Sequence, residues 1–327
     1  MRRNLPKALH HLNENGVTSV QDNTWFPHVM DAYNELYETG ALTVRLSCWS
    51  MGDSKKLVEG MKRKPFHPGY IDPGPLKFFL DGAFSSRTAW LTEPYEGEPA
   101  NYGAGIPAED IVAFLEPALQ ERRQVASHAI GDRATREYLD AAERLVDRFP
   151  HLRDMRIRIE HGQLIHHDDI RRIVDLGFHV ATQPHAAATP QKDVELVGRE
   201  RALAAYPYRS LLDAGALISF GSDYPGEASF EPLLGIHYVV NREGPEAITP
   251  TEALRAYTAG SAYAQFAENE KGTIERGKLA DLAVLSEDPT RIAPSRIKDI
   301  TVELTMMDGA VVVEQINRHP VMIGRAP

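Results

Sequence analysis

Short apolar runs alternate with amphipathic segments along most of the chain. The runs, each followed by polar residues, are 17–20, 42–49, 76–80, 124–127, 157–161, 178–183 and 216–220. Segments with apolar residues at helical spacing lie between several of them, most clearly at 111–120, 135–148, 170–176 and 209–214. Near-continuous apolar strands that alternate with helices are typical of a parallel sheet covered by helices. The pattern therefore predicts an α/β fold with seven parallel strands, one fewer than a closed eight-stranded barrel has.

The two ends of the chain depart from this alternation. The first segment predicts a helix, because Pro6 suits a first turn, Leu9 and Leu12 share a face, and Asn15-Gly16 is a stop signal. After Gly277 come three short strand-like runs, 281–285, 302–305 and 311–314, with the turn signal Asp308-Gly309 between the last two. We therefore predict a large domain over residues 1–272 and a small antiparallel unit over residues 273–327.

Composition narrows the class of protein. The 327 residues suit one barrel-sized domain, or one large and one small domain. A net charge of −10 argues against nucleic acid or an anionic membrane as the main partner. The single cysteine, Cys48, excludes a disulfide framework, and no run of 18 apolar residues or secretory signal occurs. We expect a cytoplasmic protein that acts on a small molecule, and a homo-oligomer stays open.

Polar residues follow five consecutive predicted strands, where parallel barrels carry their active sites. They are Asp81, His128, His161, the pair Gln183 and His185, and Asp223. Imidazole and carboxylate groups are ligands of zinc, iron and manganese. An aspartate beside such a metal can also accept a proton from metal-bound water. The set predicts a metal site at one rim.

Each of these residues also has a simpler interpretation. A lone histidine at a strand end is more often only a satisfied polar residue, and Asp223 could be a turn residue. Lys77 lies in a buried strand, where burial disfavours its charge. It could pair with Asp81 or Glu160, or be carboxylated, and the residues alone favour the ion pair.

Weaker signals stay open as well. Arg209 follows Tyr206-Pro207-Tyr208, which is either a packed corner, the interpretation we prefer, or a helix start whose arginine faces the substrate. We keep Arg209 as a candidate substrate-binding residue. Gly103-Ala104-Gly105 lacks the third glycine of a dinucleotide site, and His166-His167 has the surroundings of a surface pair. Trp49, Trp90 and Tyr224 could line an apolar pocket or pack in the core.

Several segments together resemble the amidohydrolase superfamily, and within it amidohydrolase family 3, the YtcJ-like branch. The segments are 16–22, 77–83 followed by 86–89, 128–134, 158–165, 220–223 and 277–285. The resemblance covers nearly the whole chain. Singly, only the segments around His128 and His161 would be specific.

The resemblance implies a metal-dependent hydrolase of carbon–nitrogen bonds other than peptide bonds, on a TIM-type (β/α) barrel. It implies that His128 and His161 are metal ligands and that Asp223 is both a ligand and the general base. Lys77 would be a carboxylated lysine that also binds the metal, which is most often zinc, with iron or manganese as alternatives. Gln183 would face the substrate, and so would His185, which we also assign to catalysis. The C-terminal strands would form half of a small β-sandwich.

The sequence departs from the family pattern in one respect. The family has a His-X-His pair after its first strand, and this chain contains none. We therefore expect a barrel without its first strand, and we suspect a fragment or a truncated gene model. Loss of two ligands should weaken metal binding. The alternatives are an inactive remnant that acts at most as a binding module, and a metal-free barrel enzyme such as a lyase.

Overall fold

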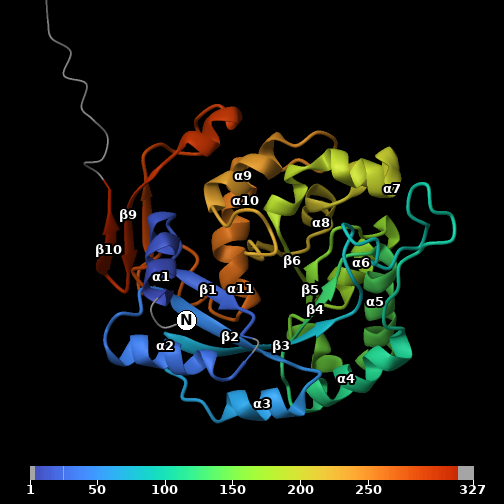
Figure 1. The fold of residues 1–327 in the computed structure, drawn as a ribbon, viewed down its shortest axis with the longest axis horizontal. Helices are drawn as coiled ribbons and strands as arrows, with labels where there is room; N and C mark the ends of the chain where they lie inside the picture. Colours follow the sequence, from blue (N-terminus) through green and yellow to red (C-terminus); the bar gives the residue numbers. More distant parts are fainter. Residues whose placement is uncertain (1–3, 25, 316–327) are drawn as a thin grey trace, which may run out of the picture.

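The computed structural model describes residues 4–24 and 26–315 (Figure 1). The strands are β1 (Ser19–Asp22), β2 (Arg45–Met51), β3 (Ile71–Phe79), β4 (Val125–Ala129), β5 (Arg158–His161), β6 (His179–Thr182), β7 (Ile218–Phe220), β8 (Leu282–Leu285), β9 (Val302–Met307) and β10 (Ala310–Glu314). The α-helices are α1 (Leu5–Glu14), α2 (Val29–Glu38), α3 (Lys55–Lys62), α4 (Ala108–Gln120), α5 (Asp132–Val146), α6 (His167–Asp175), α7 (Pro190–Ala204), α8 (Tyr208–Asp213), α9 (Pro232–Asn241), α10 (Pro250–Arg255) and α11 (Ser261–Ala264). Shorter helical segments are η1 (Pro150–Asp154), η2 (Pro184–Ala188), η3 (Ala256–Gly260) and η4 (Pro294–Asp299).

Strands β1 to β7 form one sheet in chain order, and every recorded pairing within it is parallel. The sheet curls, and helices α3 to α6 cover its outer face (Figure 1). The seven predicted parallel strands are confirmed. Because the chain runs in the same direction along each strand, all seven carboxyl ends meet at one rim.

The outer strands of this sheet are β1 and β7, as the predicted open barrel requires. The helical segment of η3 and α11 lies against both of them. The Gln21 side chain on β1 donates from Nε2 to the Ser261 carbonyl at 3.1 Å, and the Ser261 hydroxyl donates to the Phe220 carbonyl at 3.2 Å. Gly260 passes so close to the Ile218 carbonyl that an added Cβ would lie 2.2 Å from its oxygen. This segment therefore bridges the two edge strands.

The C-terminal unit is a three-stranded antiparallel sheet in the order β10-β9-β8. Its last turn has Asp308 at φ 54° and Gly309 at φ 80°, the left-handed conformations that a two-residue hairpin needs. The Thr305 hydroxyl donates to the Asn13 carbonyl at 2.6 Å, so the sheet packs beside α1 (Figure 1). The predicted antiparallel appendage is confirmed, whereas the boundary at residue 272 stays a prediction.

Two groups of buried apolar residues form the core. The larger lies between β3–β7 and their covering helices, with Ile111, Tyr138 and Ile159 among its fully buried members. The smaller lies under α1, α2 and β2 and includes Met30 and Val44. No helix in the described ranges is long and apolar enough to cross a membrane.

Candidate functional site

The ends of β4 and β5 bring His128 and His161 together at the rim. Their ring centroids are 4.4 Å apart at an interplanar angle of 67°. His128 Nε2 lies 2.8 Å from the Gly82 carbonyl, which fixes one ring nitrogen. His161 adopts φ 76°, a left-handed conformation that is uncommon for a residue with a side chain. Sub-optimal backbone of this kind concentrates at functional sites.

Burial keeps both imidazoles neutral. It lowers the pKa of His128 to about 4, against a weaker opposing effect of the hydrogen bond to Gly82. It also lowers the pKa of His161 well below its usual value, and the neighbouring His128 and Lys77 add to this shift. A neutral imidazole has a free lone pair, which is the form that binds a metal ion.

Lys77 lies inside the curled sheet with only 4% of its surface exposed. Burial lowers the pKa of its amine to about 8, while the charges of Glu160 and Asp223 oppose that shift. Arg158 holds Glu160, since its Nε donates to Oε1 at 2.7 Å. Of the two partners expected for Lys77, Glu160 is therefore the carboxylate that acts on it.

Asp81 has a different task, which the sequence did not reveal. Its carboxylate accepts backbone N–H groups of Trp90 at 2.9 Å, Ile130 at 3.0 Å and Gly131 at 2.8 Å. The contact between Gly131 and Trp90 leaves no room for a side chain, because an added Cβ would lie 2.0 Å from the Trp90 carbonyl oxygen. Asp81 therefore ties the long loop after β3 to the loop after β4.

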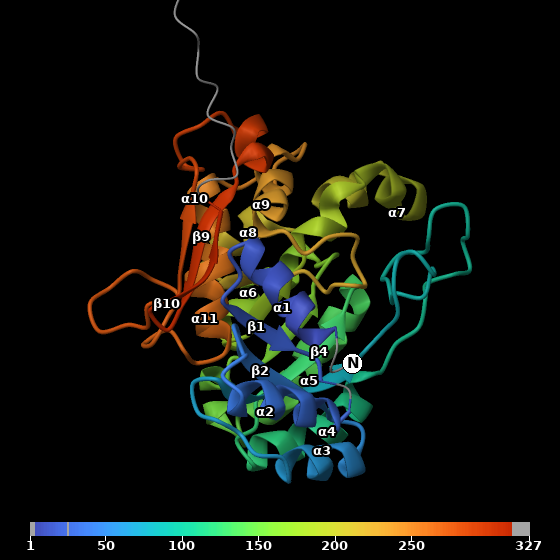
Figure 2. The same cartoon turned by 60° about the vertical axis from the view of Figure 1, so that its left-hand side comes forward.

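That long loop, residues 80–107, packs against α7. Glu96 donates its N–H to the Leu196 carbonyl at 2.8 Å, and Arg201 donates to the carbonyls of Glu93 and Pro94. Both segments extend on the same side of the molecule in Figure 2. Gly103, at φ 68°, allows the loop to fold back on Ala89, which explains the glycines that we had set aside as a weak dinucleotide signal.

Asp223 follows β7 at the same rim and adopts φ 53°. The residue is exposed overall, yet surrounding protein atoms raise the pKa of its carboxyl. The positive charge of Lys77 counters this shift and the negative charge of Glu160 adds to it. Asp223 is thus within electrostatic reach of the buried lysine.

The other predicted residues lie around this group. Gln183 is buried beside His161, and a hydrogen bond between the two side chains acts against the lowering of the His161 pKa. His185 lies in η2 and turns towards α9, where its Nε2 is 3.1 Å from the Glu231 carbonyl. Arg209 pairs with Asp213 at 2.9 Å and with Glu252 at 2.8 Å, as expected of a packed corner. The roles of these three residues stay predictions.

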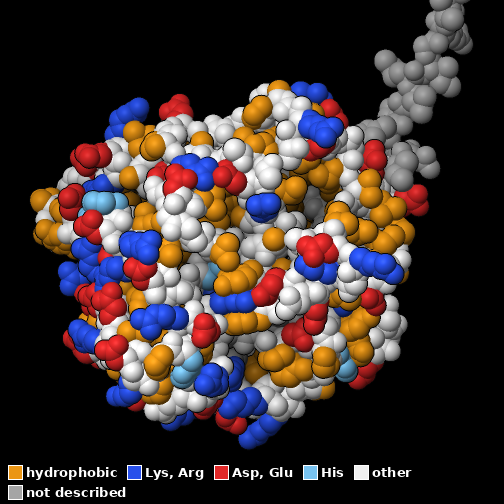
Figure 3. All heavy atoms as spheres, turned by 180° about the vertical axis from the view of Figure 1, so that it is seen from behind, with side chains coloured by type: hydrophobic (Ala, Val, Ile, Leu, Met, Phe, Trp, Pro, Cys, Tyr) orange, Lys and Arg blue, Asp and Glu red, His pale blue; other side chains and the backbone are white. Residues whose placement is uncertain are grey.

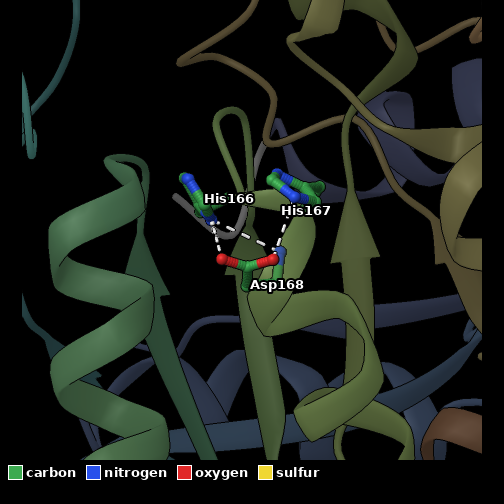
Figure 4. A group of neighbouring side chains, drawn as sticks. All are labelled: His166, His167 and Asp168. Carbon is green, nitrogen blue, oxygen red and sulfur yellow. Dashed lines mark hydrogen bonds and ion pairs between the residues drawn. The ribbon is translucent and has the colours of Figure 1, made fainter.

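Another group of possible ligands lies on the surface, where α6 begins (Figure 4). Its members are His166, His167 and Asp168, and their ligand atoms lie within 4.8 Å of one another. Among the described residues, no other group of three or more histidines, cysteines, aspartates or glutamates has its ligand atoms this close together. The rim brings the rings of His128 and His161 into contact, but no third histidine, cysteine or carboxylate of the described residues completes such a group there.

The chemistry of the rim fits a divalent metal better than the surface group does. The rim offers neutral imidazoles, a carboxylate and an amine that is shielded from water. The surface trio is largely exposed, its imidazole nitrogens already lie 2.9 and 3.5 Å from the Asp168 carboxylate, and it lies at a helix N-terminus, which disfavours a cation. Figure 3 shows positive and negative side chains interleaved over one face of the molecule.

A curled parallel sheet with paired histidines, a shielded lysine and an aspartate after its strands defines a β/α-barrel class of protein, whose site lies where the strands end. The chain belongs to the amidohydrolase family, whose model matches residues 1–313. It is 32% identical over 259 residues to the amidohydrolase YtcJ of Bacillus subtilis, covering 75% of this chain and 48% of that protein. It is 27% identical over 318 residues to the N-substituted formamide deformylase of Arthrobacter pascens, covering 92% and 58%.

Solved structures agree with this assignment. An uncharacterized metal-dependent hydrolase of Pyrococcus furiosus superposes with a TM-score of 0.78 at 32% identity, covering 89% of this chain and 60% of that one. A counterpart from Pyrococcus horikoshii gives 0.78 at 28% identity, covering 90% and 61%. The chain spans about half the length of the curated relatives it matches. The predicted family and fold are confirmed.

Proposed function

We propose that the carboxyl rim of the sheet is the catalytic centre of a metal-dependent amidohydrolase that cleaves a non-peptide carbon–nitrogen bond. One observation carries the proposal: His128 and His161, from neighbouring strands, meet with ring centroids 4.4 Å apart while burial keeps both neutral. The resemblance to a deformylase suggests N-substituted formamides as the first substrates to test. Zinc is the metal we favour, because it accepts nitrogen and oxygen ligands.

His128, His161 and Asp223 would hold the metal, with Lys77 as a further ligand, carboxylated or not. When bound, a divalent ion polarises the scissile carbonyl and lowers the pKa of water from about 15.7 towards 7. Burial raises the pKa of Asp223, which makes its carboxylate a stronger proton acceptor. Asp223 would accept the proton of the attacking water and deliver it to the leaving nitrogen.

Gln183 supports the same assignment through its position. It lies buried beside His161, and a hydrogen bond between the two side chains acts against the lowering of the His161 pKa. A buried amide beside a candidate metal ligand can hold a polar group of the substrate in place. We keep Gln183 as the substrate-orienting group.

The Asp223→Asn variant tests the proposal. Removal of a general base should lower kcat for an N-substituted formamide by about 10²–10⁴-fold, while the circular dichroism spectrum stays unchanged. Asp168→Asn, in the exposed surface trio, is the matched control and should keep full activity. Full activity of Asp223→Asn would disprove the role of Asp223.

Metal content decides between the enzyme and the remnant. Purified protein with near-stoichiometric zinc, iron or manganese, and turnover that a chelator abolishes, supports the hydrolase. Protein with neither metal nor turnover would support the binding module. Turnover that resists chelation would instead point to the metal-free barrel enzyme.

A further inference from the structure

The loop after β3 begins with a compact corner that fixes the Gly82 peptide. Gly82 donates its N–H to the Thr88 carbonyl at 3.3 Å, and Ala83 donates its N–H to the Thr88 hydroxyl at 3.1 Å. An added Cβ on Gly82 would lie 1.9 Å from Thr88 Oγ1, so no side chain fits there. Residues 77–83 and 86–89 are among those that carry the family resemblance, and the proposed function gives only Lys77 a task. The contacts show that the rest build this corner.

The corner presents oxygen acceptors to the His128 ring. Nε2 of His128 lies 2.8 Å from the Gly82 carbonyl oxygen and 3.5 Å from Asp81 Oδ1. A backbone carbonyl can only accept a hydrogen bond, so Nε2 carries the ring proton and the other nitrogen keeps its lone pair. A histidine that binds a metal usually donates its remaining N–H to a carbonyl or carboxylate, which orients the ring. The corner therefore determines how His128 is oriented at the rim.

Asp81 holds this corner against the end of β4. Its side chain is fully shielded from solvent, and it accepts backbone N–H groups from both loops, those of Trp90, Ile130 and Gly131. The first of these donors lies two residues after Thr88, and the other two directly follow β4. One carboxylate thus fixes both the segment that packs on Gly82 and the strand end that carries the histidine.

A neighbouring carboxylate joins the same two segments in a different way. Asp132, the first residue of α5, accepts the N–H groups of Thr92 and Arg133 at 3.0 Å each. It also accepts the Thr92 hydroxyl. These contacts lie farther along both segments, whereas Asp81 approaches the His128 ring itself. The two aspartates therefore allow loop anchoring to be separated from orientation of the histidine.

We propose that Asp81 is a positioning residue, which fixes the Gly82 carbonyl relative to the end of β4 and thereby orients the His128 ring to bind the metal. This proposal rests on the proposed function. Both carboxylate oxygens are in use, since Oδ1 accepts one backbone N–H and Oδ2 accepts two. Asparagine has a single acceptor oxygen, so its NH₂ group would face at least one backbone N–H, and that contact must open.

The Asp81→Asn variant of the full chain tests this role, with Asp132→Asn as the matched control. Zinc affinity is measured by competition with a chromogenic chelator, and the ring ¹⁵N shifts of His128 are recorded on the same proteins. Asp81→Asn should weaken zinc binding about tenfold, because residues that orient a metal ligand contribute about 10–100-fold. Its ring shifts should change from one tautomer to a mixture. Asp132→Asn should change the zinc affinity by less than about twofold and leave the shifts unchanged.

Gly82→Ala is the second variant, in case Asp81→Asn folds poorly. Its added Cβ must displace the corner from Thr88, so it should reproduce the weaker zinc binding and the mixed tautomer while the Asp81 carboxylate is retained. Equal weakening by Asp81→Asn and Asp132→Asn would overturn the proposal, because loop anchoring alone would then explain the effect. An unchanged tautomer in both Asp81→Asn and Gly82→Ala would overturn it as well.

The two readouts keep this proposal separate from the proposed function, since the ring shifts do not require zinc. An unmodified protein that binds no zinc would refute the proposed function. A tautomer change confined to Asp81→Asn and Gly82→Ala would, even then, support the orientation of His128 by Asp81. Zinc binding that is equally strong in the unmodified protein and in both of these variants would refute only the role of Asp81.

Discussion

Two buried arginines, each the first residue of a strand of the curled sheet, show how a saturated charge cluster differs from an open one. Arg45 begins β2, at the end of that strand opposite the carboxyl rim. Its guanidinium contacts both oxygens of Asp281 at 2.6 and 3.1 Å, and Asp308 at 3.2 Å. It also donates to the Gly69 carbonyl. Every polar group in this cluster has a partner, and the cluster joins the barrel to the C-terminal sheet.

Arg158 begins β5 and crosses the interior. It donates to Glu160 at 2.7 Å and to the side-chain amide oxygen of Gln21 on β1, and it stacks over Trp49. Lys77 and Glu160 lie around it. Their charges act on each other, although the described residues show no ion pair between these two within 4.0 Å. This cluster therefore keeps the capacity to bind a further ion.

Burial alone does not indicate function. Both arginines are nearly inaccessible, at 3% of residue surface each. Asp281 pairs bidentately with Arg45, which is a geometry that stabilises both charges. Near Arg158, by contrast, the pKa of Lys77 falls to about 8, because burial outweighs its acidic neighbours. Perturbed ionisation of this kind is typical of functional sites.

The largest expected effect is on the saturated cluster. Arg45→Met leaves Asp281 buried, with side-chain exposure of 3%, and without its main partner. The free energy of unfolding should fall by about 3–5 kcal/mol in urea titrations, because an uncompensated buried charge is costly. The double variant Arg45→Met/Asp281→Leu removes both charges and should recover most of that loss. A double variant as unstable as the single one would show that packing, not charge pairing, is responsible.

The next effect tests the open cluster. His128→Ala should weaken zinc binding at least about 100-fold, because it removes a ligand, and even supporting residues contribute 10–100-fold. Zinc affinity is measured by competition with a chromogenic chelator. His167→Ala, in the surface group of Figure 4, is the control and should leave the affinity unchanged. Weaker zinc binding by His167→Ala, with no change for His128→Ala, would place the metal at the surface group and would contradict the rim as the metal site.

Features that depend on residues close together in the chain could be predicted from the sequence. The seven parallel strands and the Asp308-Gly309 hairpin follow from apolar runs and turn residues close together in the chain. Helices α7 and α9 are among those that the sequence did not predict. Helix α7 contains Gly198 in a non-helical conformation, and the apolar residues of α9 are spread around its axis instead of forming one stripe.

Long-range pairing could not be predicted. Arg158 and Gln21 are 137 residues apart, and nothing local in either segment indicates the other. Lys77 had two candidate partners in the sequence. Only the structure shows that backbone N–H groups occupy the Asp81 carboxylate, which leaves Glu160 as the group acting on Lys77. The spacing of the motifs predicted which residue types lie at the rim, but not which hydrogen bonds each side chain makes.

The smallest expected effect concerns Asp193, a buried carboxylate on α7 that lies outside both clusters. Burial raises its pKa to about 6, although a hydrogen bond from Tyr206 and the charge of Arg242 oppose the shift. The folded protein therefore binds the proton more tightly than the unfolded chain does. The stability that this proton contributes is complete below pH about 4 and is lost as the pH rises through about 6.

Asp193→Asn cannot ionise, so it should be more stable than the unmodified protein above pH 6, by about 1–3 kcal/mol. The difference should shrink towards zero at pH 4. Urea titrations of both proteins at pH 4, 5, 6 and 7 measure it directly. A difference that stays constant over this range would mean that the shape of the side chain matters and its charge does not. A pH-dependent difference would show that Asp193 behaves like Lys77, since the buried charge of each is only partly compensated. Asp281, by contrast, is matched by Arg45.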